Sequence, residues 1–184
     1  MSPKVFAAFA KILASFYQNK SPSAALEVGA ATWTLLSIPC FQYSRKVALN
    51  AQKIKKNSPE LQKYELVLGN SNLLEFADKE FDCVMSSSVL EHDRYFWKSV
   101  EEIYRVLKPG GIFIVGVPIY MTLPTDYMNT TLTFKRHGIA YNADFYRFSE
   151  QAVREVILEK FTIHESILVR KYPNPYLVMS GVKN

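Results

Sequence analysis

The sequence predicts a doubly wound α/β fold, in which helices cover both faces of a mostly parallel sheet. Apolar runs of strand length alternate with helical stretches along most of the chain. The length of 184 residues, with 48% hydrophobic and 21% charged residues, suits one globular domain, so we expect a single domain over residues 1–184. Small or polar residues follow the first four predicted strands, at the sheet edge where such folds bind ligands.

The first predicted element is an amphipathic helix within residues 1–20. Apolar residues recur at helical spacing from Val5 to Tyr17, and Ser2-Pro3 is a start signal for a helix. Lys11 interrupts the apolar run, which is too short to cross a bilayer. We interpret this segment as a packing helix of a cytoplasmic protein, not as a leader or a membrane span.

Seven short apolar or β-branched runs indicate strands, at residues 24–28, 46–49, 64–68, 81–85, 112–117, 161–169 and 176–182. A helical stretch is predicted after the first strand, up to Pro39. A second helix is predicted to begin after a capping Asp93 and to stop at the KPGG sequence of residues 108–111. A third would run from a capping Ser149 to Lys160. Residues 119–146 have no clear period, which indicates a substrate-binding insertion or lid.

Charge and cysteine usage limit the partners that we expect. The net charge is +5, and the lysine-rich stretch between Arg45 and Lys63 lacks the interleaved aromatic residues on which bases stack. This argues for a solvated surface and against a nucleic-acid partner. Cys40 and Cys83 have neither metal-ligand spacing nor a paired framework. We therefore expect a reducing compartment and no metal.

The groups that follow four of the predicted strands suit a nucleoside-like ligand. They are Gly29-Ala30-Ala31, Asn50, Gly69-Asn70-Ser71 and Ser86-Ser87-Ser88. The amide of Asn50 can hydrogen-bond ribose hydroxyls, and that of Asn70 can reach the amino edge of adenine. Each group alone is also ordinary turn chemistry. It is the four together that favour a ligand site.

Three segments resemble the class I S-adenosylmethionine-dependent methyltransferases of the broad type 11 group. They are LEVG at residues 26–29, YELVLGNSN at residues 64–72, and the most specific one, FDCVMSSSVLEHDRYFWKSVEEIYRVLKPGGIFIVGVP at residues 81–118. The segment DFYRFS at residues 144–149 is similar to the one that opens the last helix in many members. The resemblance implies a Rossmann-like sheet of seven strands whose last two form an antiparallel edge.

The resemblance also implies S-adenosylmethionine as the cofactor and assigns residues to it. The residues around its methionine portion would be Glu27, Gly29, Ala30 and Ala31, with Ser86 and Ser87. Asn50 would take the place of the ribose-binding carboxylate. The adenine would be flanked by Gly69, Asn70 and Ser71. The family has three alternating glycines in its first loop, and here Ala31 and Trp33 replace two of them. The indole of Trp33 must either turn into the core or occupy cofactor space.

The function implied is methyl transfer to an oxygen or nitrogen atom of a small molecule, because no added domain is present to hold a larger substrate. Such transfer depends chiefly on positioning, and a nearby base assists when the acceptor carries a proton. His92, after the fourth strand, and His137, in the irregular segment, are the candidate bases, although His92 can equally brace its turn. The alternative is a binding or scaffold subunit of the same fold whose altered first loop holds the cofactor weakly. The oligomeric state stays open.

Overall fold

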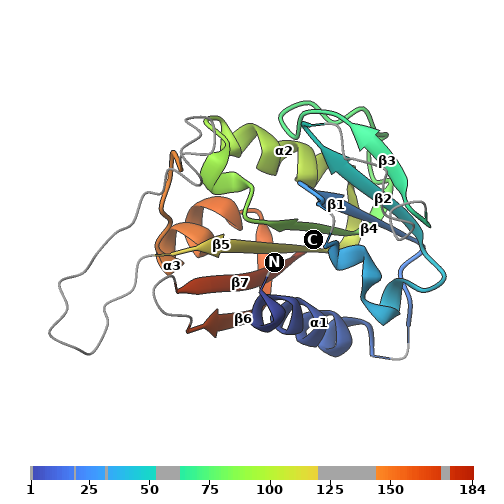
Figure 1. Cartoon of the computed structure of the whole chain (residues 1–184), viewed down its shortest axis with the longest axis horizontal. Coiled ribbons are helices and arrows are strands. Elements are labelled where there is room, and N and C mark those ends of the chain that lie inside the picture. Colours follow the sequence, from blue (N-terminus) through green and yellow to red (C-terminus); the bar gives the residue numbers. More distant parts are fainter. Residues whose placement is uncertain (1, 19, 32, 53–62, 120–143, 171–174) are drawn as a thin grey trace, which may run out of the picture.

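The computed structural model describes residues 2–18, 20–31, 33–52, 63–119, 144–170 and 175–184. These residues contain a seven-stranded sheet of order β3-β2-β1-β4-β5-β7-β6 (Figure 1). The strands are β1 (Ala24–Val28), β2 (Arg45–Asn50), β3 (Glu65–Leu68), β4 (Phe81–Ser87), β5 (Leu107–Pro118), β6 (Phe161–Val169) and β7 (Tyr176–Lys183). Strands β1 to β5 are parallel, and β7 pairs antiparallel with both β5 and β6. The predicted sheet and its antiparallel edge are confirmed.

The strand order reverses between β1 and β4. From β1 the chain moves outward to β2 and β3, then returns to the other side of β1 to form β4 and β5. In a parallel sheet this reversal separates the connections that leave the two central strands, and ligands bind beyond the carboxyl ends of those strands. The topology therefore places the expected site at the ends of β1 and β4.

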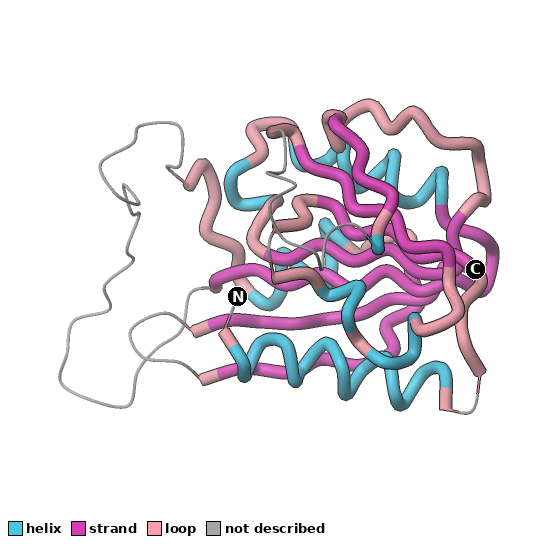
Figure 2. Tube along the Cα trace, turned by 45° about the vertical axis from the view of Figure 1, so that its right-hand side comes forward, coloured by secondary structure: helices cyan, strands magenta, loops and turns pink. Residues whose placement is uncertain are grey.

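Helices pack on both faces of the sheet, as predicted, while the strands run side by side across the molecule (Figure 2). Helix α1 (Pro3–Tyr17) buries Phe9, Ile12 and Leu13 on one face. Helix α2 (Phe96–Val106) covers the other face, together with α3 (Glu150–Ala152) and the π-helical η7 (Val153–Ile157). No described helix combines the length and the apolar character that crossing a bilayer requires.

The prediction of a helix between the first two strands is wrong. Two single 3₁₀ turns take its place, η1 (Leu35–Ser37) and η2 (Pro39–Phe41). Thr34 caps the first turn by accepting the N–H of Leu36. Pro39 has no N–H with which to continue a helix, and it begins the second turn instead. The segment after β1 is therefore short and held by side chains.

The other two predicted helices are shorter than expected. Helix α2 begins after Tyr95, not after Asp93, and it ends at Val106 because Leu107 already pairs with Phe81 as part of β5. The last helical segment ends at Ile157 rather than at Lys160. The hydroxyl of Ser149 accepts the N–H of Ala152 at 3.0 Å, so that predicted cap is confirmed. Residues 120–143, most of the expected insertion, lie outside the described residues.

Candidate functional site

The bends after β1, β2 and β3 are hydrogen-bonded to one another. The N–H groups of Gly29 and Ala30 donate to the carbonyl of Leu49 at 2.8 and 3.0 Å. The N–H of Gly69 donates to the carbonyl of Asn50 at 3.0 Å, and Asn50 Nδ2 donates to the carbonyl of Ala30 at 2.7 Å. Three of the four polar strand ends thus form one continuous rim.

The bend after β4 joins this rim through contact with Gly29. Val28 pairs with Ser86 across the two central strands. Gly29 has φ +79°, and a Cβ placed on it would lie 2.1 Å from Val89 Cγ2. Only glycine accommodates both the conformation and the close approach. The four predicted bends therefore meet at the carboxyl edge of the sheet.

Glu27 lies beneath the first bend and not on its surface. Its side chain is buried, and its Oε2 accepts the hydroxyl of Thr34 and, at 2.8 Å, the N–H of Leu35. Burial raises the pKa of Glu27 to about 7, although both donors oppose the rise. Glu27 therefore braces the segment after β1. Ala30 is buried beside it, whereas Ala31 is exposed.

The two asparagines predicted to contact the nucleoside are used partly within the protein. Asn50 Oδ1 accepts the N–H of Gln52 at 2.9 Å, in addition to the bond that its Nδ2 donates. Asn70 is exposed, and its Oδ1 accepts the N–H of Asn72 at 2.9 Å. Ser71 Oγ accepts the hydroxyl of Ser99 from α2 at 2.8 Å. Both bends are thereby shaped by their own side chains.

Trp33 does not turn into the core. Its side chain is 78% exposed, because the short turns that replace the predicted helix leave it at the surface. Of the two positions that the sequence left open for this indole, the core is therefore wrong.

A second polar group lies where β4 ends beside the start of β7. The hydroxyl of Tyr176 is 2.9 Å from Ser87 Oγ and 3.0 Å from Ser88 Oγ. Burial, reinforced by the charge of Glu91, raises the pKa of Tyr176. Ser86 is buried, and its Oγ has no hydrogen-bond partner.

Glu91 is the most unusual group in the turn after β4. It is 2% exposed, and its Oε2 is buried without a hydrogen-bond partner. Burial raises the pKa of Glu91 to about 8, with Asp144 reinforcing the rise and Arg147 opposing it. Its main-chain carbonyl accepts the N–H groups of Phe145 and Tyr146 at 2.7 and 3.1 Å. The segment before α3 is thus attached to this turn.

His92 lies in the same cluster as Glu91. Its Nδ1 is 3.2 Å from Asp144 Oδ1, and Asp144 is in turn paired with Arg147. Its Nε2 is 3.8 Å from Glu91 Oε1. The structure therefore brings this predicted base to the site and also gives it a bracing contact. His137 lies outside the described residues.

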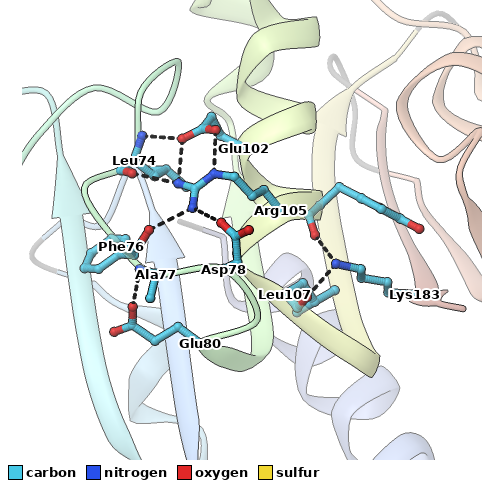
Figure 3. Close-up of polar contacts among 10 residues, drawn as sticks. Leu74, Phe76, Ala77, Asp78, Glu80, Glu102, Arg105, Leu107 and Lys183 are labelled. Atoms are coloured by element: carbon cyan, nitrogen blue, oxygen red, sulfur yellow. Dashed lines mark hydrogen bonds and ion pairs between the residues drawn. The ribbon is translucent and has the colours of Figure 1, made fainter.

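Arg105 holds the loop between β3 and β4, as Figure 3 shows. Its guanidinium donates to the carbonyls of Leu74 and Phe76 at 2.8 Å each, and it pairs with Asp78 and Glu102. Glu102 Oε2 accepts the N–H of Leu74 at 2.7 Å. Helix α2 therefore fixes the end of the bend that holds Gly69-Asn70-Ser71.

Two buried polar atoms near the end of β4 lack hydrogen-bond partners within the described residues. Among the described residues, Ser86 Oγ and Glu91 Oε2 are the buried side-chain atoms without a hydrogen-bond partner. Leaving such an atom unpaired costs about 1–3 kcal/mol, which a bound polar molecule can recover. Both lie at or just after the end of β4, so the residues present fit a polar ligand at this edge.

The sequence reasoning gave no role to Tyr176, Asp144 or the side chain of Glu91. Glu91 and Asp144 lie in segments that carried the family resemblance, so a signal for both was present. No sequence signal pointed to Tyr176, because its contact with Ser87 joins residues that are 89 positions apart. Such a contact arises only when β7 comes to lie beside β5.

Comparisons with known proteins identify part of the chain. Residues 27–115 match the family model described as "Methyltransferase domain". The chain is 28% identical over 106 residues to a demethylmenaquinone methyltransferase of Paenarthrobacter aurescens, covering 54% of this chain and 41% of that protein. It is 35% identical over 81 residues to a ubiquinone/menaquinone biosynthesis C-methyltransferase of Blochmanniella floridana, covering 44% and 31%. The chain thus spans less than half the length of these curated relatives.

The fold is shared with a solved methyltransferase. The crystal structure of the 1,6-didemethyltoxoflavin-N1-methyltransferase of Burkholderia thailandensis, with bound 1,6-didemethyltoxoflavin and S-adenosylhomocysteine, superposes with a TM-score of 0.73. The match covers 97% of this chain and 77% of that one at 20% identity. At that identity the likeness is one of fold.

Proposed function

From the match of residues 27–115 to the methyltransferase-domain family model, we propose that this protein transfers a methyl group from S-adenosylmethionine to an oxygen or nitrogen atom of a small molecule. The observation that carries the proposal is the rim in which the bends after β1, β2 and β3 are hydrogen-bonded together and the turn after β4 contacts Gly29. A single extended ligand can contact all four bends at once. We place this reaction in the cytoplasm.

The cofactor, when bound, supplies a methyl group activated by a positively charged sulfur. The residues that would hold it are Glu27, Gly29, Ala30, Ala31, Asn50, Gly69, Asn70, Ser71, Ser86 and Ser87. Among the described residues, Ser86 Oγ is the buried hydroxyl without a hydrogen-bond partner, so it is the donor best able to satisfy the methionine portion. Glu27 acts indirectly, by bracing the segment that follows β1.

The acceptor molecule would lie beyond the end of β4, next to His92. The contact of this imidazole with Asp144 orients its ring, which suits it to take a proton from an acceptor. His137 is the second candidate base. The two curated relatives are named for quinone pathways, one of them as a C-methyltransferase. A ring carbon beside a hydroxyl is therefore an acceptor to test along with oxygen and nitrogen.

Calorimetric titration with S-adenosylmethionine and with S-adenosylhomocysteine tests the proposal. We expect saturable binding of both, and weaker binding after Gly69→Trp, which places a large side chain in the bend after β3. Leu73→Trp is the matched control, because Leu73 is already 72% exposed. Absence of heat at millimolar ligand, with protein that still melts cooperatively, would contradict the proposal.

A binding or scaffold subunit is the second candidate function. It is favoured by Asn50, which stands where the family has a carboxylate and whose two amide atoms already serve the protein. An amide that is already engaged contributes less to a ribose than a free carboxylate does. The same titration separates the two functions, since this candidate predicts a folded protein that does not bind either ligand.

A further inference from the structure

A buried carboxyl in the turn after β4 has no partner for one of its oxygens. Glu91 is 2% exposed, and Oε2 is the oxygen that lacks a hydrogen bond. Buried side-chain polar atoms normally have at least one hydrogen-bond partner. Glu27, the other buried glutamate beside this site, accepts two hydrogen bonds through Oε2. The difference suggests that Glu91 has a partner that binds from outside the chain.

Charged groups of both signs surround the carboxyl of Glu91. His92 Nε2 lies 3.8 Å from its Oε1. The charges of Asp144 and Arg147 act on it with opposite sign, and Tyr176 is close enough to respond to its ionisation. Within the described residues these four groups act on it from the turn, from the segment before α3 and from β7, and the side chain of Ser88 also favours its ionised form. Within the described residues, Oε2 accepts no hydrogen bond.

The position of Glu91 relates it to the proposed cofactor site. Val89, two residues earlier, is the side chain that contacts Gly29 of the first bend. Ser86, five residues earlier, pairs with Val28 at the end of β1. The turn that holds Glu91 therefore lies against the bend where the methionine portion would bind.

We propose that Glu91 is an acid–base residue of this site, whose carboxyl ionises when the cationic methyl donor binds and then receives the proton that the acceptor loses. This inference rests on the proposed methyltransferase function. It assigns to Glu91, in place of His92, the role of receiving the acceptor's proton, and it makes Asp144 and Arg147 the groups that adjust the ionisation of Glu91.

The sign of the effect follows from electrostatics. With a pKa of about 8 the carboxyl is largely protonated in the free protein at neutral pH. A nearby cation favours the ionised form and lowers a carboxyl pKa by roughly 1–3 units. The donor carries a sulfonium charge, whereas S-adenosylhomocysteine is a neutral thioether. Donor binding should therefore release a proton that binding of the thioether does not.

The proton balance of the proposed step is simple. The acceptor's O–H or N–H bond breaks, and its proton goes to a Glu91 carboxylate oxygen. The electron pair of the acceptor atom forms the new bond to the methyl carbon, while the pair of the carbon–sulfur bond stays on sulfur. The carboxyl afterwards returns its proton to water as the products leave.

Proton release on binding tests the inference without needing the acceptor. Titrations of wild-type protein with S-adenosylmethionine and with S-adenosylhomocysteine, in two buffers of different ionisation heat near pH 7.5, give the protons released by each ligand. We expect the donor to release on the order of half a proton more than the thioether, from the pKa change above. The donor's affinity relative to the thioether should also rise as the pH increases toward 8 and should level off above it, by up to about tenfold in total per unit of pKa change.

Substitutions identify the group that titrates. Glu91→Gln should abolish the difference between the two ligands, while Glu101→Gln, at an exposed position of α2, should leave it intact. His92→Asn should also retain a difference above pH 7.5. Equal proton release by both ligands in the wild type would overturn the inference even if Glu91→Gln did not fold, as would loss of the difference in His92→Asn alone. Failure of both ligands to bind would instead refute the proposed function.

Discussion

Asn50 shows how one side chain connects two bends of the site. Its Nδ2 donates to the carbonyl of Ala30, and its Oδ1 accepts the N–H of Gln52. Three bends meet at this residue, because its own carbonyl also accepts the N–H of Gly69. A residue with this many local bonds shapes the rim whether or not it also touches a ribose.

We predict that Asn50→Ala lowers both stability and cofactor affinity. Loss of two hydrogen bonds should reduce the free energy of unfolding by about 1–3 kcal/mol. Affinity for S-adenosylhomocysteine should fall because the first bend loses its support. Urea unfolding and calorimetric titration measure the two effects. Unchanged unfolding together with weaker binding would mean that Asn50 acts on the ligand alone.

Among the described glycines, Gly29 combines a positive φ with the closest approach of a neighbouring side chain. Its φ of +79° and the 2.1 Å approach of Val89 Cγ2 to an added Cβ leave no room for alanine. We expect Gly29→Ala to lower the free energy of unfolding by about 2–4 kcal/mol, from backbone strain and overpacking together. Gly29→Ala combined with Val89→Ala should recover the overpacking part. If the single variant were as stable as the wild type, the contact between these two bends would be refuted.

At the scale of elements, helix α2 supports the bend after β3. Arg105 donates to the carbonyl of Leu74, and Glu102 accepts the N–H of Leu74 (Figure 3). Ser99 donates a further hydrogen bond to Ser71. These contacts connect the helix to the loop proposed to flank the adenine. The order of that loop therefore depends on α2.

We predict that Arg105→Met weakens cofactor binding more than its loss of stability explains. Each net hydrogen bond lost from the loop is worth about 1 kcal/mol, so the affinity for S-adenosylhomocysteine should fall about fivefold or more. Lys183→Met is the matched control, since Lys183 donates to the carbonyls of Tyr104 and Leu107 on the other side of α2 (Figure 3). Equal loss of affinity in both variants would show a general effect of destabilisation.

At the scale of the whole molecule, two buried glutamates make stability depend on pH. Burial raises the pKa of Glu27 to about 7 and that of Glu91 to about 8, against 4.5 in an exposed chain. Between pH 4.5 and these raised pKa values, the folded protein binds more protons than the unfolded one. The free energy of unfolding therefore decreases as the pH rises through this range.

The expected result is a decrease in the free energy of unfolding from about pH 5 to about pH 8, on the order of a few kcal/mol. Urea unfolding across this range measures it. Glu27→Gln should remove about half of the dependence below pH 7, and Glu91→Gln should remove the other half together with the part between pH 7 and pH 8. A wild-type stability that increases over the same range would show that these carboxyls are ionised in the folded protein.

Strands were predicted better than helices. The bounds of β1 and β6 agree with the predicted runs, because β1 is buried throughout and β6 alternates between exposed and partly buried residues, and both patterns can be recognised locally. The helix after β1 was predicted from its apolar residues, but Thr34 and Pro39 set two short turns there. Helical period alone does not show that a proline and a capping side chain will divide a segment.

The sequence by itself determined the sheet, its parallel part and the edge at which four polar bends gather. It could do so because strand period and turn residues are local properties of the chain. Only the tertiary structure decided that Asn50 is engaged by neighbouring bends, that Trp33 is exposed, and that Glu91 has an unpaired oxygen. Those outcomes depend on which distant segments pack together, as Val89 does on Gly29, and no local pattern records such partners.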